Sequence, residues 1–250
     1  MKRWSWKVLR LVYSAMLAMA FIQTPSMAAK HPGGDSETLR SLAAQRDSFV
    51  QRARESGVAC PLPPPRIILS DKSSHGSYDP KNNLLQTPSW QELKPGERDL
   101  FYQLAGPGAA ENQVREDFEN VIHRWALARD LGHWWQSCKR TNVVRSHFEI
   151  EYDADRIAAA YWREVDPALM DKLADGFRRV LKGMPIQLPV GETPERYFND
   201  HFGETTGTAS YTWFEAFMIA SVEAEDPLPS FSDALADGRT PVEPAPPPPN

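Results

Sequence analysis

The 250-residue sequence predicts a mostly helical α+β domain, and two observations support this fold class. Apolar side chains recur at helical spacing through most of the chain after Pro88, whereas only two short segments before it have strand character. Hydrophobic residues make up 41% of the chain, which is enough for one core or at most two. Two cysteines are too few for a disulfide-rich scaffold.

Residues 1–28 have the pattern of a secretory signal peptide, with four basic residues, no acid and small residues before a cleavage point. The apolar stretch 11–22 is shorter than the roughly 20 residues that span a bilayer. We therefore expect cleavage after Ala28 and a periplasmic or secreted protein; an uncleaved anchor is the alternative. Without these four positive charges, the net charge of −5 becomes −9, which argues against nucleic-acid binding.

The N-terminal part of the mature chain combines one helix with two strand candidates. Residues 29–57 predict a helix that Asp35 or Ser36 caps and that ends at Gly57. A proline-rich connector opens the main domain, residues 58–225, and is followed by predicted strands at 66–70 and 83–87. Turn residues at 79–83 precede the second strand.

The remainder of the domain predicts a series of helices and a tail. The helices are expected at 95–104, 111–138, 148–164, 167–182, 193–202 and 210–223. Residues 226–250 are rich in proline and predict a disordered tail, either an extended spacer or a proline-rich docking motif.

Two of these helices concentrate residues that occur in metal sites. The helix at 111–138 carries the run Arg129-Asp130-Leu131-Gly132-His133, followed by two tryptophans and a glutamine. The helix at 148–164 carries Glu151 and Asp155, and 18 positions separate His133 from Glu151. Residues four apart on a helix share one face, so each helix presents its pair together.

This arrangement resembles the zincin-type zinc metallopeptidases, which carry His-Glu-x-x-His on one helix and Glu-x-x-x-Asp on the next. The resemblance implies a zincin-like domain with a small sheet and a helical C-terminal lobe. It implies His133 and Glu151 as zinc ligands, and Asp155 as a carboxylate that orients a ligand histidine. The turn and strand at 78–87 are similar to the edge strand that these enzymes place beside the substrate.

Two positions depart from the family pattern. Arg129 stands where the first histidine belongs, and Arg has no lone pair to give a metal. Two ligands remain, so the metal position is expected to be partial and vacant, with zinc as cofactor only if the site is active. We expect the Arg129 guanidinium to replace the metal by pairing with Glu151 or Asp155 within about 5 Å; the alternative is an Arg that extends to solvent.

Asp130 is the second departure, because it stands at the position of the catalytic Glu. Its side chain is one methylene shorter, so a water placed for Glu would lie over 1 Å beyond its reach. We therefore interpret Asp130 as a vestigial general base.

Other candidate side chains have mainly structural interpretations. His123 lies about 15 Å along the helix from His133, and His147, His201 and Tyr211 are expected in structural roles, with site contacts as the alternative. Cys60 and Cys138 are able to form a disulfide if they lie close together; the sequence leaves this open. Five tryptophans are expected in the core, with aromatic substrate contacts in a cleft as the alternative: Trp125, Trp134, Trp135, Trp162 and Trp213.

The predicted function is an exported, metallopeptidase-like protein that is catalytically degenerate, a pseudopeptidase that binds an extended polypeptide along the strand at 83–87. One alternative is an active zinc-dependent peptidase or hydrolase in which His133, Glu151 and a third group such as His147 hold the metal. A second alternative is a structural envelope protein without a ligand.

Overall fold

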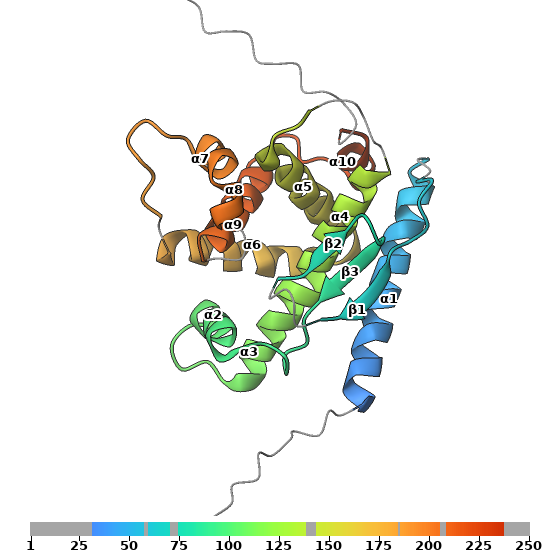
Figure 1. Ribbon diagram of the computed structural model, residues 1–250, viewed down its shortest axis with the longest axis horizontal. Coiled ribbons are helices and arrows are strands. Elements are labelled where there is room, and N and C mark those ends of the chain that lie inside the picture. Colours follow the sequence, from blue (N-terminus) through green and yellow to red (C-terminus); the bar gives the residue numbers. More distant parts are fainter. Residues whose placement is uncertain are drawn as a thin grey trace, which may run out of the picture. The chain divides into compact units, whose positions relative to one another are not determined.

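The computed structural model of the protein describes residues 32–57, 60–70, 75–138, 144–184, 186–205 and 209–237. The predicted signal peptide, residues 1–28, and residues 238–250 of the predicted tail lie outside these ranges. The described part is mostly helical and contains one small sheet, which confirms the α+β class (Figure 1). Among its helices, none has an apolar stretch of the length needed to cross a membrane.

The sheet has three strands, β1 (Arg66–Leu69), β2 (Ser77–Asp79) and β3 (Leu84–Thr87), in the order β1-β3-β2. β3 runs parallel to β1, with Arg66 opposite Leu84, and antiparallel to β2, with Ser77 opposite Gln86. The two predicted strands are confirmed to within one residue. The three-residue strand β2 was not predicted, because it is too short to show an alternating pattern.

The position of β3 corrects one prediction. The segment 83–87 was expected to be an edge strand that pairs with a polypeptide, but β3 lies in the middle of the sheet and is paired on both sides. The edge beside the candidate site belongs to β2, which packs against α4. The turn between β2 and β3 holds this order: Asp79 Oδ1 accepts the backbone N–H groups of Lys81 and Asn82 at 2.9 and 3.2 Å.

The described helices follow the predicted order. They are α1 (Pro32–Glu55), α2 (Pro95–Ala105), α3 (Glu111–Phe118), η1 (Glu119–Ala126), α4 (Leu127–Ser137), α5 (His147–Val165), α6 (Pro167–Gly183), α7 (Pro194–Asp200), α8 (Phe202–Thr205), α9 (Ala209–Glu223) and α10 (Phe231–Asp237). α3, η1 and α4 follow one another without a break and form the predicted long helix. Its middle part, η1, is a π-helix.

Two predictions about the chain ends are wrong. α1 already includes Pro32, so Asp35 lies in its first turn instead of capping it. The predicted disordered tail contains α10, whose Phe231 and Leu235 are 2% and 0% exposed. The Phe231 ring packs edge-on against Phe49 at 5.1 Å, and Trp135 donates a hydrogen bond to the Leu235 carbonyl at 3.2 Å.

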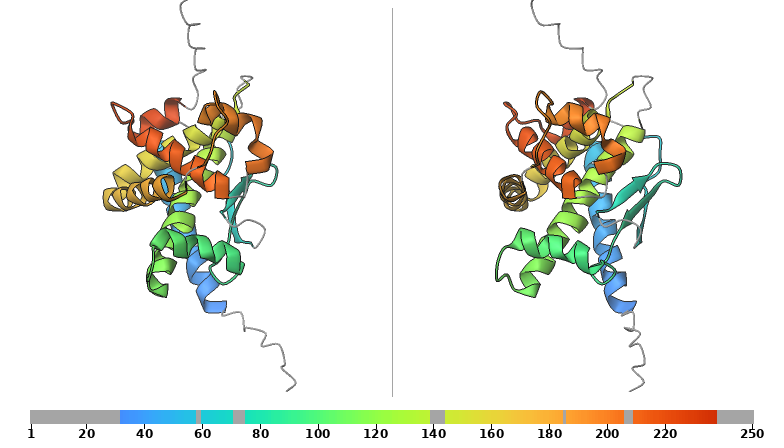
Figure 2. Two further views of the ribbon diagram at one scale, coloured as in Figure 1. Left: turned by 90° about the vertical axis from the view of Figure 1, so that its left-hand side faces the viewer. Right: turned by 60° about the vertical axis from the view of Figure 1, so that its left-hand side comes forward.

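Helix α5 lies at the centre of the core. Its alanines at 154 and 158–160 are buried, and small side chains let α4, α9 and α10 approach closely. The tryptophans at 125, 134, 135 and 162 are also buried, as predicted, whereas Trp213 is partly exposed and stacks on Phe217. α1 and α4 pack against the sheet on one side (Figure 2).

A disulfide joins Cys60 to Cys138 and settles the question that the sequence left open. It connects the proline-rich connector before β1 to the end of α4. The two cysteines are 78 positions apart, so the bond closes a long loop and restricts the unfolded chain.

Candidate functional site

Helices α4 and α5 bring the predicted site residues together. Arg129 and His133 lie one turn apart on α4, and Glu151 lies in the second turn of α5. α5 begins with a capping box: Ser146 accepts the Glu149 N–H at 3.2 Å, and the Glu149 carboxylate accepts the Ser146 N–H at 2.8 Å. This cap fixes the start of the helix that carries Glu151.

A glycine sets the close spacing of the two helices. A Cβ atom at Gly132 would lie 3.1 Å from the Cα and carbonyl oxygen of Ala154, so a side chain there would meet the backbone of α5. The small pair Gly132 and Ala154 therefore lets the faces that carry Arg129 and Glu151 meet.

The Arg129 guanidinium lies among four acceptor side chains. Its Nη2 donates to Glu151 Oε2 at 2.6 Å and to the Tyr211 hydroxyl, and its Nη1 donates to Glu215 Oε1 at 3.3 Å. Nε lies 3.8 Å from Asp155 Oδ1. The predicted pairing of Arg129 with Glu151 or Asp155 is thus present, and Arg129 is only 7% exposed, which excludes the alternative in which it extends to solvent.

The electrostatics of this group favour a charged pair. Burial opposes the charged form of Arg129, but the neighbouring Tyr211, Glu151 and Glu215 raise its pKa well above the usual value. Burial alone would raise the pKa of Glu151, yet Arg129 and His133 hold the pKa of that carboxyl below its usual range. Arg129 and Glu151 therefore remain oppositely charged at neutral pH.

His133 is held from both ring nitrogens. Nδ1 lies 3.0 Å from Gln136 Oε1, and Nε2 lies 3.3 Å from Glu151 Oε2. Burial opposes protonation of the imidazole, but the Glu151 carboxylate outweighs it and raises the pKa of His133. The Gln that follows the two tryptophans in the sequence thus orients the ring of His133.

Two aspartates, Asp130 and Asp155, are buried beside these residues. Burial raises the pKa of Asp130 to about 7 and the pKa of Asp155 well above its usual value. Both Asp155 oxygens are without a hydrogen-bond partner among the described residues. Asp155 Oδ1 lies 3.8 Å from Arg129 Nε, without a hydrogen bond to it. Gly76, with φ +82°, lets the chain before β2 approach Asp130, since a Cβ there would lie 3.1 Å from Oδ2.

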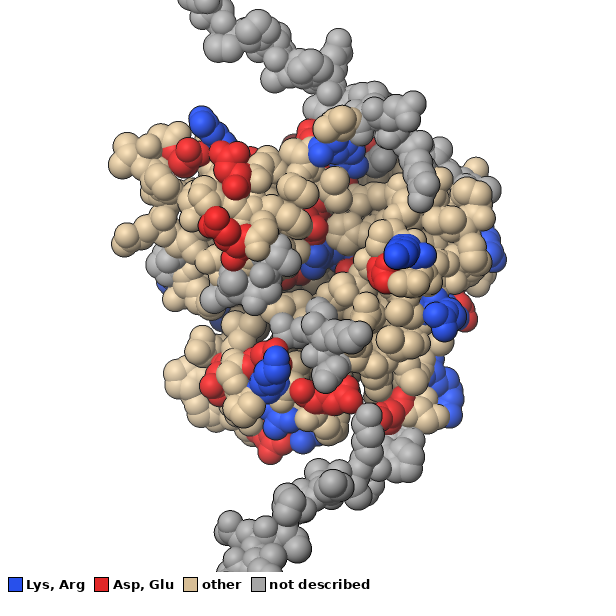
Figure 3. All heavy atoms as spheres, in the orientation of Figure 1, with Lys and Arg blue, Asp and Glu red and all other residues tan. Residues whose placement is uncertain are grey.

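α9 contributes two residues that sequence reasoning did not assign to the site. Tyr211 was favoured as a structural residue, but its hydroxyl donates to Glu151 Oε2 at 3.0 Å. Glu215 was not considered, although it lies four positions after Tyr211 on the same helical face. A third residue, His75, packs its ring 6.4 Å from that of Tyr211, and burial lowers its pKa. Figure 3 shows basic and acidic atoms meeting at the floor of a hollow between β2 and α9.

The other histidines have partners elsewhere in the fold. His123 lies between Glu119 and the Pro88 carbonyl, at 2.5 and 2.8 Å. His147 stacks on Phe202, with ring centroids 4.1 Å apart, and His201 stacks on Tyr197 at 4.2 Å. These contacts give His147 a packing role at the start of α5.

The donor set does not fit the zinc ion that the family resemblance implies. Of the expected ligands only His133 and Glu151 are present, and Glu151 Oε2 already accepts hydrogen bonds from Arg129 and Tyr211. Within the described ranges, no three His, Cys, Asp or Glu side chains are grouped so that they could hold a metal ion. A zinc ion between His133 and Glu151 would also lie close to the Arg129 charge.

Comparisons of the chain with protein-family models, with curated proteins and with solved structures found no match.

Proposed function

We propose that this protein is an exported, zincin-like pseudopeptidase that binds an extended polypeptide without cleaving it. The observation that carries the proposal is the 2.6 Å hydrogen bond from Arg129 Nη2 to Glu151 Oε2. Arg129 lies one helical turn before His133. The Arg129 guanidinium, which cannot coordinate a metal, stands at the position of the first histidine. It forms an ion pair with the Glu151 carboxylate, which would be the third ligand.

The local electrostatics support this replacement. Arg129 brings a fixed positive charge beside Glu151 and Glu215, and against the effect of burial the Glu151 carboxylate raises the pKa of His133. A zinc ion would bring positive charge to the same place. The site keeps its electrostatic balance but has no metal-bound water to act as nucleophile.

Two features support export. The first 28 residues have the pattern of a signal peptide. The disulfide between Cys60 and Cys138 is the kind of bond that persists in oxidising compartments and is rare in the cytosol.

Strand β2 is the element best placed to bind a polypeptide. Within the described sheet β2 pairs on one side only, with β3, and it follows directly after Gly76, which approaches Asp130. An extended chain that adds to β2 through main-chain hydrogen bonds would run beside the hollow that contains Arg129. This replaces the predicted pairing at 83–87.

Restoring the zincin pattern at positions 129 and 130 tests the proposal that the protein has a zincin-like site. The variant Arg129→His/Asp130→Glu restores a His-Glu-x-x-His pattern, so we expect it to bind about one zinc per chain and to cleave casein. The control is Arg124→His, which removes an Arg of the same long helix that pairs with Asp166 at 2.6 Å, away from the site. A reverted protein that folds but takes up no zinc would contradict the zincin-like assignment.

Proline substitutions at the two sheet edges test polypeptide binding. Fluorescently labelled, unfolded casein is the probe, and its affinity is measured by anisotropy. Ser77→Pro in β2 should weaken binding by about tenfold or more, because proline blocks strand addition, whereas Ile68→Pro in β1 should not. Absence of binding to the native protein, or equal effects of the two prolines, would contradict this role of β2.

A further inference from the structure

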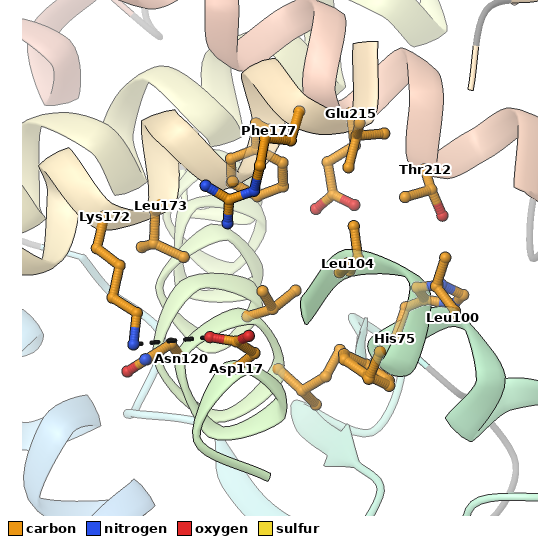
Figure 4. A pocket seen from close by; sticks show the side chains of 16 residues that line it. His75, Leu100, Leu104, Asp117, Asn120, Lys172, Leu173, Phe177, Thr212 and Glu215 are labelled. Carbon is orange, nitrogen blue, oxygen red and sulfur yellow. Dashed lines mark ion pairs between the residues drawn. The ribbon is translucent and has the colours of Figure 1, made fainter. Parts of the chain in front are cut away.

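A cavity of about 50 Å³ lies between α2, η1, α6 and α9, and it shares Glu215 with the group of side chains around Arg129 (Figure 4). Its walls are mainly aliphatic and aromatic. The apolar side chains that line it include Leu100, Leu104, Val121, Leu173, Phe177 and Val180. A π-helical segment, η1, supplies one wall, and such segments occur often at functional sites.

The size of the cavity limits what enters it. A volume of roughly 10–15 Å³ holds one water molecule, so this cavity holds several atoms in a row. Most of the surface that faces the cavity is apolar, although polar side chains also reach it, namely His75, Asp117, Asn120, Lys172, Arg179, Thr212 and Glu215. An aliphatic chain of roughly four to six carbons matches both its volume and its walls.

One end of the cavity is polar and contains an unpartnered group. Thr212 is 6% exposed, and its Oγ1 has no hydrogen-bond partner among the described residues. Figure 4 shows Thr212 and Glu215 reaching from α9 toward the cavity. Glu215 Oε1 accepts one hydrogen bond from Arg129 at 3.3 Å, and a carboxylate has further acceptor capacity. This end therefore favours a ligand group that donates hydrogen bonds and carries positive charge.

Two cations of α6 line the cavity, Lys172 and the exposed Arg179, and Lys172 is held by acids. Lys172 Nζ lies 2.6 Å from Glu116 Oε1 and 3.6 Å from Asp117 Oδ1. A carboxylate ligand would have to compete with two acids for Lys172 or pair with the exposed Arg179, and a reversed pose would bring it against the buried Glu215.

We propose that this cavity is a binding site for a short primary alkylamine. The alkyl chain lies between α2, η1 and α6, and the ammonium group donates hydrogen bonds to Thr212 Oγ1 and to the Glu215 carboxylate. The proposal does not depend on the pseudopeptidase assignment, because neither zinc nor a polypeptide takes part in it.

Gly176 provides a variant that fills the cavity. It lines the wall on α6, and a Cβ there would have Arg179 Nη2 as its nearest neighbour, at 3.8 Å. Gly176→Leu therefore places a side chain in the cavity without a backbone clash. Gly183→Leu is the matched control, since Gly183 ends the same helix, is not among the lining residues and has no atom within 4 Å of an added Cβ.

Calorimetric titration at pH 7 with hexylamine, 1-hexanol and hexanoate tests the site in the mature, disulfide-bonded protein. We expect hexylamine to bind with a Kd on the order of 1 mM and hexanoate to bind at least about tenfold more weakly. Gly176→Leu and Thr212→Val should each weaken hexylamine binding by about tenfold or more. Gly183→Leu should bind like the native protein, and circular dichroism checks that each variant is folded.

Three results would overturn the proposal: no binding of hexylamine, unchanged binding by the folded Gly176→Leu variant, or hexanoate binding as tightly as hexylamine. If Thr212→Val binds hexylamine like the native protein, the placement of the ammonium group is wrong. Hexanol separates the two contributions, because it shares the chain and the hydrogen bond but lacks the charge.

Discussion

Arg129 brings a full positive charge into a position that is only 7% exposed, and Glu151 and Glu215 compensate it there. Removing one partner of a buried ion pair leaves the other charge without compensation, which is more destabilising than removing both. The stability of the site therefore depends on the pair as a unit.

A double-mutant cycle measures this dependence. Arg129→Met should lower the free energy of unfolding by about 3–5 kcal/mol, and the double variant Arg129→Met/Glu151→Leu should be less destabilised than the sum of its single variants. The exposed pair Arg178 and Asp175 is the control, where Arg178→Met should cost less than about 0.5 kcal/mol. Urea unfolding at pH 7 provides the values; additive effects at Arg129 and Glu151 would contradict the ion pair.

Asp130 should make the stability depend on pH. Its pKa is raised to about 7 in the folded protein, so between about pH 4 and pH 7 the folded state holds a proton that the unfolded state has lost. Stability should fall as the pH rises through this window. The raised pKa of His133 lowers stability further only as the pH rises above 6.5, the ordinary value for histidine. The free energy of unfolding of Asp130→Asn, measured relative to that of the native protein, should therefore increase by about 2–4 kcal/mol between pH 4 and pH 8. Parallel pH profiles of the two proteins, measured by urea unfolding, would refute this assignment.

The sequence indicated part of this site and could not indicate the rest. Arg129, His133 and Glu151 lie on two helices that adjoin along the chain, so helical spacing predicts their meeting. Tyr211 and Glu215 are 82 and 86 positions after Arg129, and only the packing of α9 against α5 brings them near. Tyr and Glu four apart on a helix are too common to indicate a site by themselves.

At the scale of elements, the close packing of α4 on α5 determines whether the site forms. Gly132→Ala gains in helix propensity but pushes a methyl group against the Ala154 backbone at 3.1 Å. We expect a net destabilisation of about 1–3 kcal/mol. Gly176→Ala on α6 is the matched control, with its nearest contact at 3.8 Å, and should stabilise the protein by about 0.5–1 kcal/mol. Stabilisation by Gly132→Ala in thermal unfolding would show that the helices do not depend on this glycine.

The elements that the sequence did not reveal are short. β2 has three residues, and α10 has seven residues inside a proline-rich segment, so neither shows a clear period. Tertiary contacts form them: β2 is paired with β3, and Phe231 of α10 packs on Phe49. The long helices were predictable, because their apolar faces repeat over several turns.

At the scale of the whole molecule, helices α4, α5 and α9 meet at the charged group around Arg129, and the edge strand β2 packs against α4. The disulfide from Cys60 to Cys138 ties the sheet side to the end of α4, which limits how far these parts separate. The zincin-like architecture remains a proposal that rests on the order and spacing of these elements.

The zinc content of the native protein tests the central claim most directly. The purified, unmutated protein is dialysed against buffer with a slight excess of zinc and then against zinc-free buffer, and its metal is measured by mass spectrometry. We predict well under one zinc per chain, since Glu151 is held by Arg129. One zinc per chain that is retained by the native protein and lost in His133→Ala would contradict the replacement of the metal by a guanidinium.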